Sequence, residues 1–169
     1  ELDEADRLKS IAEAQGIVPL IKLCTSGSAE AKEKAASTLW HLALDEANRT
    51  FIGAQGGINP LANVLASGST KEAITHASFA LARLGKDNTE NQYMIAKCLI
   101  LMLDSESAEV ELRAVRALEA LAAEKAGAPT SIVKNGAITP LVTVLTKGKS
   151  EESREEAGKL LLTLADSGA

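Results

Sequence analysis

The stretch Gln55-Gly56-Gly57-Ile58-Asn59-Pro60-Leu61 decides the fold, because similar stretches stand at two other places in the chain. They are "QGIVPL" at 15–20 and "NGAITP", followed by Leu141, at 135–141. The prolines at 19, 60 and 140 are therefore separated by 41 and 80 residues. Self-similarity at a period near forty residues is typical of a helical solenoid, in which each repeat packs on its neighbours.

Each copy of the unit is expected to hold a short, a medium and a long helix. The glycine and proline mark the corner between the first two helices, since proline is tolerated in the first turn of a helix. Apolar residues spaced i, i+4 and i+7 give the long helices one buried face. These faces are Ala35, Leu39, Leu42; Ala77, Leu81, Leu84; Ala114, Leu118, Leu121; and Ala157, Leu161, Leu164.

The third copy lacks the glycine–proline corner. Residues 91–97 run directly into "CLILMLDSES", so the short helix should be poorly separated from the second helix there. The sequence thus predicts an all-α chain with one domain over residues 1–169. We expect four repeats at approximately 5–47, 48–89, 90–126 and 127–166.

Composition narrows the class of protein. Apolar residues make up 46% of the chain but aromatic residues only 2%, which suits thin layers of Ala, Leu, Ile and Val between helices. The net charge of −5 argues against a general nucleic-acid binder, because neutralising phosphates needs clustered Lys and Arg. Cys24 and Cys98 lie in apolar runs and are interpreted as buried thiols in a reducing compartment.

The sequence also bears on the cellular location of the protein and on its assembly. No apolar run approaches the length of a membrane span, and the N-terminus lacks the features of a signal peptide. The protein is expected to be intracellular, in the cytoplasm or the nucleus. Neither terminal copy has the polar outer face that solenoid ends usually carry, which indicates possible end-to-end self-association or stacking on further repeats.

The unit resembles the armadillo repeat. The resemblance rests on the corners at Gly16–Leu20, Gly57–Leu61 and, with one extra residue, Gly136–Leu141, and on "IAEAQG", "SIVKNG" and "TLWHLA". HEAT repeats are the nearest alternative, but they lack the short first helix and the glycine corner. The resemblance implies a right-handed α-solenoid whose third helices line a concave groove. In this family such grooves bind extended segments of partner proteins.

Groove residues follow from the resemblance position by position. Where many armadillo proteins place a groove Trp, this chain has Ser37, Phe79, Arg116 and Lys159. Where they place a groove Asn, four residues later, it has His41, Arg83, Ala120 and Thr163. Trp40 matches the Trp of an "LWNLA" form seen in other members, with His41 in place of Asn. One helical turn before the Trp-type positions stand Lys34, His76, Arg113 and Glu156.

These positions suggest a basic track on an acidic protein. Such a track would attract an acidic or phosphorylated segment through its local field. The alternative is that its cations are ordinary solvated residues. Trp40 is either partly buried against the next repeat or a binding hot spot. The predicted peptide-binding groove comprises Lys34, Ser37, Trp40, His41, His76, Phe79, Arg83, Arg113, Arg116, Lys159 and Thr163.

The sequence does not predict an enzyme. It has no glycine-rich phosphate loop after a strand and no nucleophile elbow. The acidic start of the last helix is explained by the helix dipole, and the His and Cys residues lack zinc spacing. No cofactor or metal is expected. The hypotheses are a protein-binding scaffold, a structural unit that stacks end to end, and the substrate-recognition part of a larger ligase or transport receptor.

Overall fold

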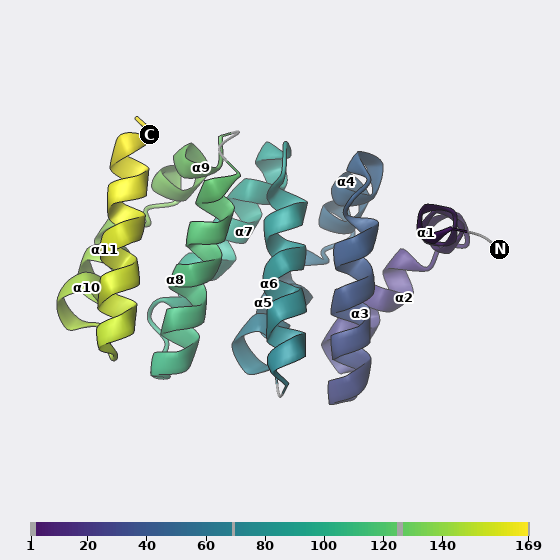
Figure 1. The fold of residues 1–169 in the computed structure, drawn as a ribbon, viewed down its shortest axis with the longest axis horizontal. Coiled ribbons are helices and arrows are strands. Elements are labelled where there is room, and N and C mark those ends of the chain that lie inside the picture. The colour runs from purple at the N-terminus through teal and green to yellow at the C-terminus, as the bar shows by residue number, and fades with distance from the viewer. Residues whose placement is uncertain (1–2, 69, 125–126, 169) are drawn as a thin grey trace. The chain divides into compact units, whose positions relative to one another are not determined.

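The chain folds into helices joined by short turns (Figure 1). A computed structural model describes residues 3–68, 70–124 and 127–168, and no strand occurs among them. The chain divides into two compact units, Glu1–Leu84 and Gly85–Ala169. The first unit holds α1 (Glu4–Glu13), α2 (Ile17–Ser26), α3 (Ala29–Leu42), α4 (Glu46–Ala54), α5 (Ile58–Ser67) and α6 (Lys71–Gly85), whose last residue belongs to the second.

The second unit holds the remaining helices, which are α7 (Thr89–Met102), α8 (Ala108–Ala123), α9 (Ala128–Lys134), α10 (Ile138–Lys147) and α11 (Glu151–Asp166). The all-α class is therefore confirmed. As the sequence predicts, α7 is one continuous helix of 14 residues, because the corner that separates α1 from α2 and α4 from α5 is missing there. The division into four repeats stays a prediction.

Short polar side chains fix where several helices begin. Ser28 accepts a hydrogen bond from the backbone N–H of Ala31 at 3.2 Å and so caps α3. Asp45 caps α4 in the same way, through the N–H of Asn48 at 2.9 Å. Each cap satisfies a helix N–H that has no partner within the helix.

The corner works through two adjacent residues. The first takes a left-handed backbone conformation, with φ of 59° at Gln15, 74° at Gly56 and 79° at Gly136. The second must come close to the preceding helix, because a Cβ at Gly57 would lie 2.7 Å from Ile52 Cγ2. A Cβ at Gly56 or Gly136 would meet nothing within 4 Å, so space limits the side chain at the second position and not at the first.

The predicted extra residue in the last corner is wrong. Gly136 takes the left-handed position of Gly56, so Ala137 stands where Gly57 stands and nothing is inserted. The hydrogen bond from Ala137 N to Ile132 O is 3.4 Å long, against 2.9 Å from Gly57 N to Ile52 O. The alanine is accommodated by a slightly wider approach.

The core consists of the long-helix faces and their small neighbours. The predicted faces of α3, α6 and α8 are fully buried. In α11 the buried leucines are Leu160 and Leu164, while Leu161 is only half-buried, so that part of the prediction is wrong. Leu161 points about 100° away from Leu160 around the helix. No Phe, Tyr or Trp is buried among the described residues, so Ala, Leu, Ile and Val form most of the core, as predicted.

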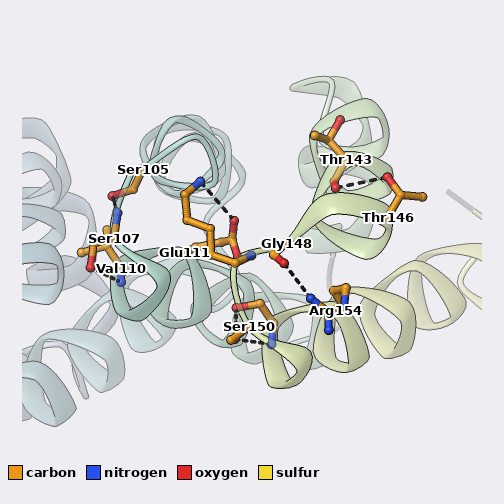
Figure 2. Close-up of polar contacts among 11 residues, drawn as sticks. Ser105, Ser107, Val110, Glu111, Thr143, Thr146, Gly148, Ser150 and Arg154 are labelled. Carbon is orange, nitrogen blue, oxygen red and sulfur yellow. Dashed lines mark hydrogen bonds and ion pairs between the residues drawn. The ribbon is translucent and has the colours of Figure 1, made fainter.

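Buried polar groups tie neighbouring helices together. Arg49 donates to the carbonyls of Ala43 and Leu44 just past the end of α3. Glu111 of α8 is buried, and it accepts a hydrogen bond from Lys149 N at 2.9 Å in the turn before α11. Figure 2 shows Glu111 facing that turn, beside Ser150 and the bond from Arg154 to the Gly148 carbonyl.

The two cysteines differ in burial. Cys24 is buried, as predicted, whereas Cys98 is only half-buried. Burial raises the pKa of the Cys24 thiol to about 11, against a smaller opposing effect of Lys32. Burial also raises the pKa of Cys98. Neither cysteine forms a disulfide bond within the described residues.

Candidate functional site

Four ring side chains meet on the long helices α3 and α6. The Trp40 ring centroid lies 5.3 Å from that of Phe79 and 6.0 Å from that of His76, with the His76 ring stacked at 21°. His41 lies 4.6 Å from Trp40 on the same helix. Figure 1 shows α3 and α6 side by side, which lets rings from the two helices touch. Trp40, His41, His76 and Phe79 are called the aromatic cluster below.

The aromatic cluster is open to solvent. Phe79 is 49% exposed and the other three rings are half-buried. The whole chain has one Trp, one Tyr and two Phe, so half of these residues gather here. Trp40 is half-buried and lies against rings of α6, and its role as a binding hot spot stays a prediction. Large exposed rings that contact one another are typical of binding surfaces.

The Nδ1 atoms of the two histidines differ in hydrogen bonding. His41 Nδ1 lies 2.7 Å from the Ser37 carbonyl oxygen, and because a carbonyl only accepts, Nδ1 carries the proton. The Nδ1 atom of His76 is buried with no hydrogen-bond partner within the described residues. His76 therefore lies against Trp40 mainly through its ring face.

Charged residues flank the aromatic cluster. Lys34 on α3 pairs with Glu33 at 3.2 Å. Glu33 also accepts a hydrogen bond from the Thr70 hydroxyl at 3.0 Å, and this bond, with a smaller effect of Lys34, lowers the pKa of Glu33. Arg83, one turn beyond Phe79, is half-buried and has no ion-pair partner within the described ranges.

The second unit places the remaining predicted residues on α8 and α11, which lie side by side (Figure 1). Each predicted cation there has a carboxylate partner: Arg113 pairs with Glu109, Arg116 with Glu152, and Lys159 with Glu156. These pairs cancel much of the positive field of the track in this unit. The Thr163 hydroxyl donates to the Lys159 carbonyl, and Ala120 is half-buried.

The predicted residues divide between the two units, and ring contacts join Trp40 to His41, His76 and Phe79. The first unit holds Lys34, Ser37, Trp40, His41, His76, Phe79 and Arg83, and the second holds Arg113, Arg116, Lys159 and Thr163. Sequence reasoning missed the carboxylate partners. Helical spacings of i, i+4 and i, i+3 could have identified Glu109 and Glu156. Nothing in the sequence points to Glu152, which lies 36 positions from Arg116.

The described residues offer neither a cluster of metal ligands nor a membrane-spanning helix. They contain no group of three or more His, Cys, Asp or Glu side chains placed to hold a metal ion. None of their helices is long and apolar enough to cross a membrane.

Comparison with known proteins identifies the fold. The profile of the armadillo/β-catenin-like repeat matches residues 8–44. An engineered protein of known structure is 29% identical over 95% of this chain, with a TM-score of 0.63. A designed armadillo repeat protein in complex with the peptide (KR)4 is 25% identical over 96% of this chain and 74% of its own, with a TM-score of 0.59.

A second engineered protein is also 29% identical, over 95% of this chain, with a TM-score of 0.62. This chain spans 66% of the first engineered protein and 43% of the second, so less than two thirds of either. No curated protein sequence matches it significantly. The predicted resemblance to the armadillo repeat family and the α-solenoid fold are confirmed.

Proposed function

We propose that this chain, which has the fold of an armadillo-repeat solenoid, binds an extended segment of a partner protein on the exposed face of α3 and α6. The observation that carries the proposal is the aromatic cluster, where Trp40 and Phe79 lie 5.3 Å apart with Phe79 half-exposed. Tryptophan is enriched among the residues that dominate binding energy. The designed relative solved with a peptide supports this use of the fold.

The aromatic cluster would hold an apolar side chain of the partner. Rings that touch on one side and face water on the other lose water from a large area when a ligand covers them. Ser37 and Lys34 precede Trp40 along α3, and Arg83 follows Phe79 along α6, so polar groups border the rings. The partner segment would therefore combine an apolar anchor with polar or charged neighbours.

The partner segment is expected to carry negative charge near Arg83. Arg83 favours an acidic or phosphorylated residue beside the apolar anchor, because no carboxylate of the described ranges pairs with it. Arg113, Arg116 and Lys159 would contribute less, since a partner must first displace their carboxylates. The designed relative instead binds a basic peptide. Charge preference therefore needs its own test.

Two phenylalanines of similar exposure offer a matched test. Phe79 is 49% exposed in the aromatic cluster, and Phe51 on α4 is 45% exposed outside it. Peptides of about twelve random residues would be selected on the wild-type chain and measured by isothermal titration calorimetry. Phe79→Ala should weaken binding about tenfold or more, while Phe51→Ala should leave it unchanged. Equal losses in both variants would refute the proposed site.

The charge preference is tested with the same peptides. Asp-to-Lys exchange at the charged positions should weaken binding to the wild-type chain and strengthen binding to Arg83→Glu. Lys86→Glu, on an exposed residue past the end of α6, is the control for net charge. A wild-type preference for the lysine peptides would contradict the acidic-segment proposal and leave the aromatic cluster as the site. We further propose that the chain is not an enzyme and does not bind nucleic acid.

A further inference from the structure

The helices α2 and α10 are equivalent by sequence but present opposite apolar faces to solvent. Both have ten residues, begin with isoleucine and carry proline at the third position. Each has one apolar face made of its first, fifth and eighth residues and another made of its fourth and seventh. We name these the forward face and the backward face.

The forward face is covered in α2 and open in α10. In α2 it consists of Ile17, Ile21 and Cys24, which are 3%, 8% and 2% exposed. In α10 it consists of Ile138, Val142 and Leu145, which are 40%, 44% and 40% exposed. The same positions carry apolar side chains in both helices, but they are buried in α2 and exposed in α10.

The backward face shows the reverse. In α10 it consists of Leu141 and Val144, which are 0% and 3% exposed. In α2 it consists of Leu20, which is half-buried, and Leu23, which is 41% exposed. Of these two helices, α10 therefore presents an open forward face and α2 an open backward face.

Within the first unit, the structure shows what covers a forward face. Helix α2 contacts α5, the next medium helix along the chain. Ile21 faces the start of α5, because a Cβ at Gly57 would lie 3.2 Å from Ile21 Cδ1. The backward face of α5, formed by Leu61 and Val64, is fully buried. Gly57, Leu61 and Val64 are spaced i, i+4 and i+7 and so lie on one side of α5, which places the backward face of α5 toward the forward face of α2.

From this pairing we infer that the forward face of α10 binds the backward face of α2 in a second copy of this chain. The contact would repeat between chains the packing that α2 and α5 make within one chain. It is head to tail, since the two partners use different surfaces. After one contact, each end of the pair still has an open face, so association continues instead of stopping at a dimer.

Neighbouring positions on the long helices agree with this inference. On the backward side, Ala73 of α6 is buried, whereas Ala31, 42 positions earlier on α3, is half-buried. On the forward side, Leu118 of α8 is fully buried, whereas Leu161 of α11 is half-buried and Leu162 is exposed. At each of these positions the long helix nearer the end of the chain is therefore less buried than its interior equivalent.

Two substitutions block one face each. Val142→Glu puts a charge on the forward face, and Leu23→Glu puts one on the backward face. Sedimentation velocity of the wild-type chain, from about 10 μM to about 1 mM, should show a mass that rises with concentration above 17.6 kDa. Each variant alone should associate at least about tenfold more weakly than wild type. Phe51→Glu, on an exposed ring of α4, is the control and should associate as wild type does.

Mixing the two variants gives the decisive measurement. Val142→Glu keeps its backward face and Leu23→Glu keeps its forward face, so an equal mixture should form a dimer and nothing larger. Circular dichroism of each variant confirms that it is folded, and recovery of association in the mixture shows that both remain competent. A strictly monomeric wild type, unchanged association in both variants, or a mixture that exceeds a dimer would overturn the inference.

Discussion

Replacing Gly85 by alanine should destabilise the protein although alanine is the better helix former. A Cβ at Gly85, the last residue of α6, would lie 2.5 Å from Leu121 Cδ1. Leu121 is fully buried and has little room to move. Overpacking of this kind costs about 1–3 kcal/mol, and the gain in helix propensity is at most ~1 kcal/mol. We expect a net loss of roughly 1–2 kcal/mol in the free energy of unfolding.

A second helical glycine supplies the matched control. A Cβ at Gly158 in α11 would meet its nearest heavy atom, Leu145 Cδ1, at 3.4 Å, which is ordinary contact. Gly158→Ala should therefore stabilise the protein by up to ~1 kcal/mol. Urea unfolding followed by far-UV circular dichroism should move the two midpoints in opposite directions, each by about 0.5 M.

Shortening Leu121 should remove the clash that a side chain at Gly85 would make. Leu121→Ala should cost about 2–5 kcal/mol by itself, because it empties part of the core, but it also removes the atom that alanine at position 85 would strike. In that background Gly85→Ala should be neutral or stabilising, with a coupling free energy of roughly 1–3 kcal/mol. If Gly85→Ala unfolds at or above the wild-type midpoint, or if its effect is the same in both backgrounds, the reasoning is refuted.

Three further outcomes are expected. Glu111→Ala should lower the free energy of unfolding by about 1–3 kcal/mol, with Glu111→Gln closer to wild type, because Lys149 N loses its acceptor. At pH 8 a thiol reagent should modify Cys98 in the folded protein much faster than Cys24, whose pKa is raised to about 11. The pKa of Glu33 is lowered, so its contribution to stability is complete above about pH 4.3 and is lost as the pH falls through the lowered value. Wild type and Glu33→Gln should therefore converge in stability in acid, and a constant difference down to pH 2 would contradict this assignment.

The architecture could be predicted from the sequence because the repeats share the same short-range patterns. A glycine–proline corner, an apolar stripe and a period near forty residues are all local patterns, and α1 to α11 follow them closely. The errors arose where a position depends on what lies beside it. Gly57 and Ala137 occupy the same place, but only the backbone angles reveal it. Leu160 and Leu161 are both apolar, and only the packing of α11 decides which is buried.

The candidate site was harder to predict for a related reason. Sequence alignment placed Trp40 and Phe79 on long helices but could not show that their rings touch. It also counted cations without their partners. In the sequence Arg116 has no evident carboxylate partner, but in the fold it pairs with Glu152. Long-range ion pairs carry no periodic signal, so charge patterns on solenoids are best judged after the helices are stacked.

The position of Trp40 has a practical consequence for studying how this chain folds. It is the sole tryptophan of the sequence and lies in the first of the two compact units. Its intrinsic emission therefore follows the unfolding of Glu1–Leu84, whereas the helical signal near 222 nm averages over both units. Coincident transitions would mean that the two units melt as one cooperative block. Separate transitions would give each unit its own stability without labels or truncation.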